Sequence, residues 1–163
     1  MIRRARLPHA GGRGWCSCRR ARHLGSPAPT YAAIARLHDW VGTGLPAPST
    51  ARITVSDGRS PVIVTDDDGI ARGGVRTPWV DTPLAVTSGL NTESDRMATL
   101  FGSGELFDAA HLARRYPGGR TDYLTEFTAA LDRAIGAGFL VSADRQEILD
   151  LTTITAGWRF DAE

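Results

Sequence analysis

The 163-residue sequence predicts a mainly α-helical chain with a short β-hairpin and a long irregular loop, which makes it an α+β fold as it stands. Three observations support this class. Apolar residues recur at helical spacing near residues 28–41 and 108–151, as in helices that place one face on a core. Two β-rich runs flank Asp57-Gly58, which is a strong hairpin signal. A stretch rich in glycine and proline then interrupts the regular pattern. One domain is expected at this length.

The first predicted helix covers residues 28–41, and two glycines just beyond it favour termination there. Prolines in residues 45–48 then predict an extended connector, since each proline disfavours helix in the residue before it. We interpret His38 as a solvated or core-edge side chain, because no ligand-type residue other than its neighbour Asp39 lies at helical spacing from it. The apolar stripe of this helix is predicted to face the core and consists of Tyr31, Ile34, Leu37 and Val41.

The predicted hairpin pairs residues 52–55 with residues 62–65. Its second run leads into the segment 66–69, where three successive aspartates and a glycine suggest a calcium loop as one alternative. An EF-hand loop needs oxygen ligands at alternate positions over about twelve residues and a closing glutamate, and this segment has neither. We therefore predict a polar turn at residues 66–69.

Residues 70–89 form the predicted irregular loop, and Arg76, Trp79 and Asp81 are its candidate site residues. Paired glycines before them permit positive φ or close backbone approach, and two prolines fix extended geometry around Trp79. In one interpretation these residues line a substrate pocket, with Arg76 as an anion clamp and Asp81 as its orienter or a catalytic acid. In the other, Arg76 and Asp81 tie the loop down by charge-assisted hydrogen bonds while Trp79 enters a core. The lack of a nearby histidine or nucleophile in the sequence favours the second interpretation.

Three helices are predicted in the last third of the chain. The first begins at an Asp108 N-cap, the second covers residues 121–137, and the third starts at Ser142 or Asp144. Their apolar stripes are interpreted as core faces rather than as a cofactor site, and neither a cofactor nor a metal is expected. His111 has only one acid and two arginines at helical distance and is predicted to be a surface residue.

Basic residues are concentrated at the N-terminus. The chain has 19 arginines and no lysine, residues 1–22 hold seven of these arginines, and no acidic residue precedes Asp39. Such a head is a candidate nucleic-acid or membrane arm with Trp15 as a stacking residue. A targeting signal is a second alternative, although no apolar stretch follows the charges. The third is a zinc-type site, which is a weak match because the single residue between its cysteines strains a shared chelate. Its ligands would be His9, Cys16, Cys18 and His23.

We favour a fourth explanation, in which the head lies outside the fold. An aperiodic mixture of arginine, glycine, cysteine and tryptophan is typical of a high-GC gene that is read out of frame or from a misplaced start. The predicted division is therefore a basic, disordered head at residues 1–26, a folded part at residues 27–157 and a tail at residues 158–163.

Several chemistries are missing from the sequence. It contains no Gly-x-Ser-x-Gly nucleophile elbow, no Gly-x-x-x-x-Gly-Lys-Ser/Thr phosphate loop, no His-Glu-x-x-His and no Cys-x-x-Cys. No run approaches the roughly eighteen apolar residues of a membrane span, and none is predicted. The formal net charge of +1 gives the chain as a whole no electrostatic reason to bind nucleic acid. Nothing in the sequence indicates a cellular location.

Short motifs follow the tryptophan-containing first helix and its proline-rich connector in a fixed order. They are Gly73-Gly74-Val75-Arg76-Thr77-Pro78-Trp79-Val80-Asp81 with Pro83, Leu100-Phe101-Gly102, Phe107-Asp108-Ala109-Ala110 with Leu112 and Tyr116-Pro117, and Ala137-Gly138-Phe139-Leu140. With these motifs the chain resembles the C-terminal portion of the bacterial alpha/beta hydrolase domain-containing proteins over about residues 28–150. Residues 1–26 do not share the resemblance.

The resemblance implies hydrolase ancestry, with ester or related acyl hydrolysis as the reaction of the intact protein. It also implies that the nucleophile elbow and catalytic histidine lie in a core upstream of the matched region, so no catalytic residue is carried over to this chain. The leading hypothesis is a truncated C-terminal fragment that is inactive alone and whose partner is the missing N-terminal core. The alternative is a stand-alone interaction module that binds a protein partner through the apolar surface that this core would cover.

Overall fold

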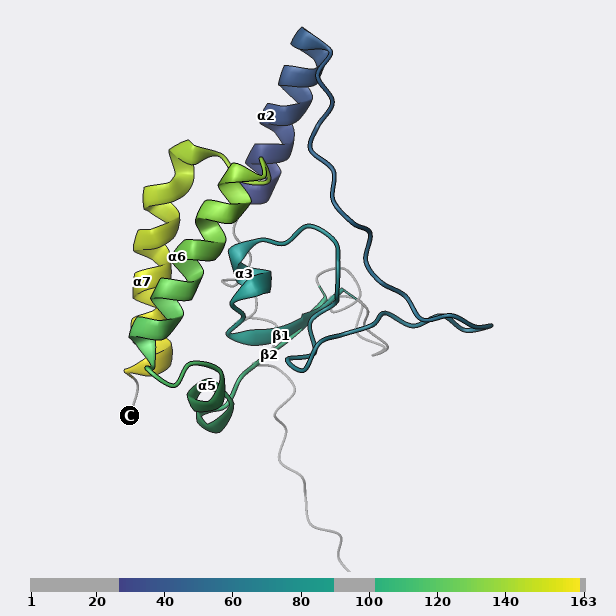
Figure 1. Cartoon of the computed structure of the whole chain (residues 1–163). Coiled ribbons are helices and arrows are strands. Elements are labelled where there is room, and N and C mark those ends of the chain that lie inside the picture. The colour runs from purple at the N-terminus through teal and green to yellow at the C-terminus, as the bar shows by residue number, and fades with distance from the viewer. Residues whose placement is uncertain (1–26, 90–101, 162–163) are drawn as a thin grey trace, which may run out of the picture.

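The computed structural model describes residues 27–89 and 102–161. Two long antiparallel helices, α6 and α7, form one side of the molecule, and α3, α5 and a two-stranded sheet lie against them (Figure 1). This arrangement confirms the predicted mainly helical α+β class. The elements are α2 (Ala28–Thr43), α3 (Pro78–Asp81), β1 (Ala85–Ser88), β2 (Ser103–Leu106), α5 (Ala109–Arg115), α6 (Arg120–Gly136), a 3-10 turn (Ser142–Asp144) and α7 (Arg145–Phe160).

The core forms around the inner face of α6. Phe127 and Leu131 of this helix are fully buried, as the helical spacing predicts, and Leu140 closes the end of the cluster from the following loop. Tyr116 is fully buried as well, and its hydroxyl donates to the carbonyl of Pro83 over 2.9 Å. This hydrogen bond joins the end of α5 to the segment that leads into β1.

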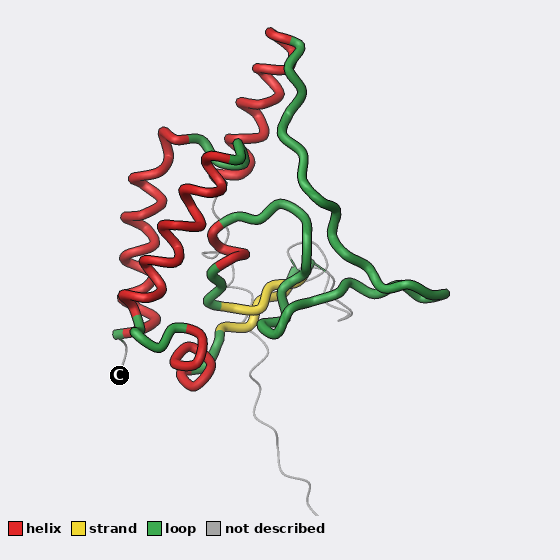
Figure 2. Tube along the Cα trace, viewed as in Figure 1, coloured by secondary structure: helices red, strands yellow, loops and turns green. Residues whose placement is uncertain are grey.

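The continuous sheet lies outside the predicted hairpin. Strands β1 and β2 pair antiparallel, with Ala85 opposite Leu106. The predicted pairing around Asp57-Gly58 is present as a short antiparallel contact in a long loop that projects away from the helices (Figure 2): an isolated bridge joins Val55 to Ile63, the N–H of Ser56 donates to the Val62 carbonyl over 2.9 Å, and the N–H of Val64 donates to the Thr54 carbonyl over 3.0 Å. The pairing is not longer because the apolar side chains Ile53, Val55 and Val62 are exposed and bury no face against a core.

The paired glycines of the loop are required by a close backbone approach. Gly73 and Gly74 both have positive φ, near 78° and 72°. A Cβ atom on Gly73 would collide with the carbonyl oxygen of Arg52, and the N–H of Gly74 donates to the carbonyl of Ala51 over 2.9 Å. Substitution of Gly73 would therefore separate the two chain segments that meet here.

Helix α2 differs from its prediction in orientation. The helix itself is present, but the prediction that its apolar stripe faces the core is wrong. The exposed fractions of the stripe are 56% for Tyr31, 60% for Ile34, 54% for Leu37 and 81% for Val41. The small residues Ala28 and Ala32, on another face of the helix, are buried instead. The spacing predicted a helix with one apolar face correctly, but it carries no information on what covers that face.

The C-terminal helices follow their sequence signals. The carboxylate of Asp108 caps α5 by accepting from the N–H of His111 over 2.7 Å, as predicted. The last helix continues to Phe160 and so crosses the predicted boundary at residue 157. Among the residues that the structure describes, no helix is long and apolar enough to cross a membrane.

We expect the free energy of unfolding to fall as the pH rises above about 10, the ordinary pKa of tyrosine. Burial raises the pKa of both Tyr116 and Tyr123 in the folded chain. Above the ordinary value the unfolded chain therefore releases phenolic protons that the folded chain retains, and folding becomes less favourable with each increment of pH. Urea unfolding between pH 8 and 11 measures the slope.

The double variant Tyr116→Phe/Tyr123→Phe should have a shallower slope, because it cannot release these protons. Tyr31→Phe, on the exposed face of α2, is the matched control and should keep the wild-type slope. Equal slopes for the double variant and the wild type would contradict this explanation.

Candidate functional site

Asp81, the last residue of α3, is where the charged groups of the loop meet the helices. Its carboxylate accepts from Arg76 Nε over 2.6 Å and from Arg133 Nη2 of α6 over 3.4 Å. Its backbone carbonyl accepts from Arg115 Nη2 of α5 over 3.3 Å. One residue thus connects the loop to two helices that lie far along the chain.

The guanidinium of Arg76 makes its contacts within its own loop. Besides Asp81, it donates from Nη1 to the carbonyl of Ala71 over 2.9 Å and from Nη2 to that of Val80 over 3.4 Å. All three of its nitrogens therefore have partners, and the side chain is 34% exposed. This geometry matches the loop-tying interpretation of Arg76 and Asp81, whereas their place in a substrate pocket stays a prediction.

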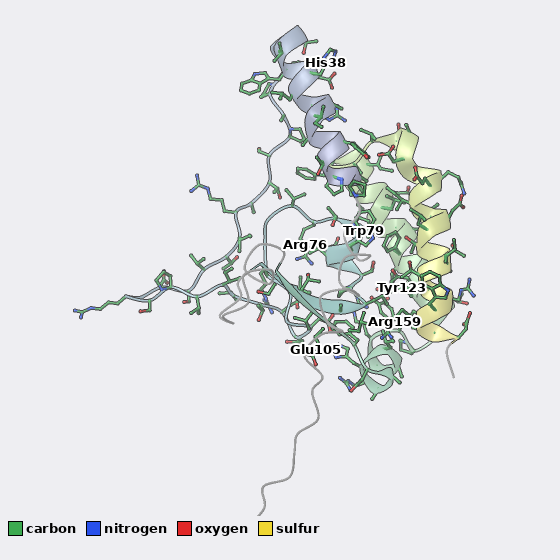
Figure 3. All side chains as sticks on the ribbon, turned by 180° about the vertical axis from the view of Figure 1, so that it is seen from behind. His38, Arg76, Trp79, Glu105, Tyr123 and Arg159 are labelled. Atoms are coloured by element: carbon green, nitrogen blue, oxygen red, sulfur yellow. The ribbon has the colours of Figure 1, made fainter. Side chains whose placement is uncertain are left out.

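The side chain of Trp79 points from α3 toward the long C-terminal helices (Figure 3). It is partly buried and packs against the core cluster. Its ring meets that of Phe127 edge to face, with centroids 5.7 Å apart and planes at 78°. Such pairs contribute about 0.5–1.5 kcal/mol beyond the area that they bury. The three candidate residues thus lie on one short helical turn and the segment just before it, held by charge on one side and by aromatic packing on the other.

A second group of charges, centred on Asp68, was not predicted from the sequence. Asp68 Oδ1 lies 2.8 Å from His111 Nε2, and its Oδ2 lies 3.3 Å from Arg115 Nε. The His111 ring also stacks on Phe107 with centroids 3.9 Å apart and planes at 9°. His111, which was predicted to be a surface residue, is partly buried, with its side chain 25% exposed.

The sequence held no signal for this contact, because 43 residues separate Asp68 from His111. What it did predict was the polar turn that presents Asp68. The side chain of Asp66 accepts from the N–H groups of Asp68 and Ile70 over 3.1 and 2.9 Å, which forms that turn. Asp68 itself is then left to contact α5.

Arg115 links the two groups of charges. It contacts Asp68 and the Asp81 carbonyl, and its Nη1 lies 2.8 Å from Glu126 Oε2 of α6. Burial alone would lower the pKa of Arg115, but the neighbouring Tyr116, Glu126 and Asp68 together raise it. The guanidinium consequently stays charged and acts as a permanent bridge between the turn, the loop and the two helices.

The chemistry available to this network is positional. In serine hydrolases, a carboxylate orients the histidine that acts as general base, and the pair of Asp68 and His111 has the same two groups. A histidine of this kind acts only when a nucleophile that it can deprotonate lies within hydrogen-bond reach. The sequence contains no Gly-x-Ser-x-Gly nucleophile elbow, and in the described part of the chain the side chain of His111 contacts Asp68 and Phe107. Within residues 27–89 and 102–161, no three His, Cys, Asp or Glu side chains converge to hold a metal ion. The zinc-type pattern of residues 9–23 and the stacking residue Trp15 lie outside the described residues.

Comparison with known proteins identifies one family. A family model described as alpha/beta hydrolase domain matches residues 4–150, which is most of the chain. This match confirms the resemblance to alpha/beta hydrolase domain-containing proteins, whereas the assignment to the C-terminal portion of such a protein stays a prediction. It begins within the basic stretch that the sequence analysis placed outside the family, so the boundary at residue 26 stays a prediction. No curated protein and no solved structure matches the chain.

We expect Asp81→Asn to lower the free energy of unfolding by about 1–2 kcal/mol, because it removes the charge that two arginines share in a partly buried setting. Asp39→Asn is the control: it breaks the exposed i,i+3 pair with Arg36 and should cost about 0.2–0.5 kcal/mol. Chemical denaturation at neutral pH measures both. Equal costs for the two substitutions would contradict the anchoring role of Asp81.

Proposed function

Because the chain belongs to the alpha/beta hydrolase domain family, we propose that it is the C-terminal part of such a domain and works together with a core that carries the nucleophile. The reaction of the joined protein is ester or related acyl hydrolysis. This chain alone has no hydrolytic activity. The observation that carries the proposal is a family match over residues 4–150 in a sequence that contains no Gly-x-Ser-x-Gly.

The missing motif matters for a physical reason. In the alpha/beta hydrolase fold, the nucleophilic serine sits on a sharp turn between strand and helix, with backbone N–H groups nearby to bind the oxyanion. That turn belongs to a large, mostly parallel sheet. The described part of this chain has one sheet, of two antiparallel strands, which offers no such turn.

The charged network supports a structural role for this part. Arg76, Arg115 and Asp81 satisfy one another and the loop backbone, and Trp79 is anchored on Phe127. A loop fixed in this way can border the pocket of a core without supplying the reacting groups. Arg76, Trp79 and Asp81 are therefore proposed as residues that shape the pocket edge of the joined domain.

A second candidate function is a stand-alone module that binds a protein partner. The observation that favours it is the exposed apolar stripe of α2, since soluble monomers rarely expose contiguous patches of large apolar side chains. The two candidates differ in whether a partner supplies catalysis.

We expect a fluorophosphonate probe, which labels activated serines, to leave the purified chain unlabelled, and p-nitrophenyl ester hydrolysis to stay at the level of a heat-denatured sample. A catalytically complete serine hydrolase, treated in parallel, is the positive control. Stoichiometric labelling of one serine of this chain, detected by intact-mass spectrometry, would show that it carries its own nucleophile and would contradict the proposal.

A further inference from the structure

The dipeptide Asp-Gly occurs twice in the chain, as Asp57-Gly58 and as Asp68-Gly69. The first copy lies within residues 56–62, at the end of the loop that projects away from the helices, and the second lies in the turn that contacts α5 (Figure 1). An aspartate before glycine is prone to isomerisation of its peptide bond, because glycine has no side chain to hinder its own backbone nitrogen. The surroundings of each copy then decide whether the reaction takes place.

We propose that Asp57 is a site of spontaneous isoaspartate formation in the folded chain, whereas Asp68 is protected. In the first step the backbone nitrogen of Gly58 bonds to Cγ of Asp57, and the carboxyl hydroxyl leaves as water with the N–H proton, which gives a cyclic succinimide. Water then adds to one of the ring carbonyls and breaks its bond to the nitrogen. Opening at Cγ restores aspartate, and opening at the backbone carbonyl carbon gives isoaspartate. The water lost is regained, so no co-reactant is needed.

Both reacting groups are free at Asp57. The hairpin hydrogen bonds stop on either side of it, since the N–H of Ser56 donates to the Val62 carbonyl over 2.9 Å and the N–H of Val62 donates to Ser56 Oγ over 3.0 Å. Residues 57–60 between them are exposed. Within the described part of the chain, neither the Asp57 carboxylate nor the Gly58 N–H has a hydrogen-bond or ion-pair partner. The Gly58 nitrogen can therefore reach the carboxyl carbon without breaking another contact.

Both reacting groups are held at Asp68. Its Oδ1 lies 2.8 Å from His111 Nε2, its Oδ2 lies 3.3 Å from Arg115 Nε, and its side chain is 22% exposed. The N–H of Gly69 donates to the Asp66 carbonyl over 3.0 Å. Ring closure at Asp68 must first break these contacts, so it requires a local opening of the turn.

Isoaspartate at position 57 would change the tip of the hairpin chemically. The peptide bond then runs through the side-chain carboxyl, which lengthens the backbone by one carbon and leaves a free α-carboxylate. Isoaspartyl methyltransferases esterify this carboxylate with S-adenosylmethionine, so the modified chain becomes a substrate for an enzyme of that class. The core cluster includes no residue of the tip, and the helical fold should stay unchanged.

The test incubates the full chain at neutral pH and physiological temperature and measures isoaspartate at each site by peptide mapping with electron-transfer fragmentation. In the folded chain we expect isoaspartate to form at least about tenfold faster at position 57 than at position 68. In concentrated urea, where the contacts of Asp68 are lost, the two rates should agree within about threefold.

Two variants test whether Asp57 is the reactive residue. Asp57→Glu has a longer side chain that closes such a ring far more slowly, so the folded variant should lose most of its methyl acceptance from an added isoaspartyl methyltransferase. Asp67→Glu is the matched control, because Asp67 is exposed and is not followed by glycine, and it should keep the wild-type methyl acceptance.

The opposite results would overturn the proposal. Equal rates at the two sites of the folded chain would contradict the protection of Asp68 by His111 and Arg115. Isoaspartate that forms at position 57 only in urea would show that the folded chain holds the tip closed to the reaction. Methyl acceptance that survives Asp57→Glu would place the reactive site elsewhere. None of these results bears on the proposed function.

Discussion

The structure depends on the burial of the inner face of α6. Phe127 at its centre contacts Trp79 of the loop and Tyr123 of its own helix, and Tyr116 reaches from α5 to hold the Pro83 carbonyl. These residues come from three separate segments, so the core exists only when loop, α5 and α6 have docked together. In the part of the chain that the structure describes, the regular β-structure is one short two-stranded sheet, and these aromatic side chains form the hydrophobic core together with aliphatic residues such as Leu131 and Leu140.

The ion pairs act on top of that core and fix the loop. Arg115 and Asp81 join the turn at residues 66–69, the loop and both neighbouring helices through contacts of 3.4 Å or less. The side chains of Arg76, Asp81, Arg115 and Asp68 are 22% to 34% exposed, so their attraction is less screened than that of the surface pair Arg36 and Asp39, which are 37% and 50% exposed. These ion pairs therefore fix the position of Trp79 and of the loop segment around it. The charged side chains of the network bind one another.

The sequence predicted correctly those features that depend on interactions between residues close together in the chain. The α6 stripe, the Asp108 cap and the turn at residues 66–69 each depend on side chains within a few residues, and each is present. The contact of Asp68 with His111 joins chain segments that meet only after folding, so the spacing of residues in the sequence could not predict it. The stripe of α2 shows a related limit, because helical periodicity indicates an apolar face but not whether this chain covers it.

The chain belongs to the alpha/beta hydrolase domain family, and the central proposal is that it works only together with a nucleophile-bearing core. Reconstitution tests it most directly. Ester hydrolysis would be measured for the full chain, for a nucleophile-bearing core of the same family, and for the two mixed at equal concentration. The account predicts that the mixture exceeds the sum of the separate rates. A mixture no faster than the core alone would contradict it.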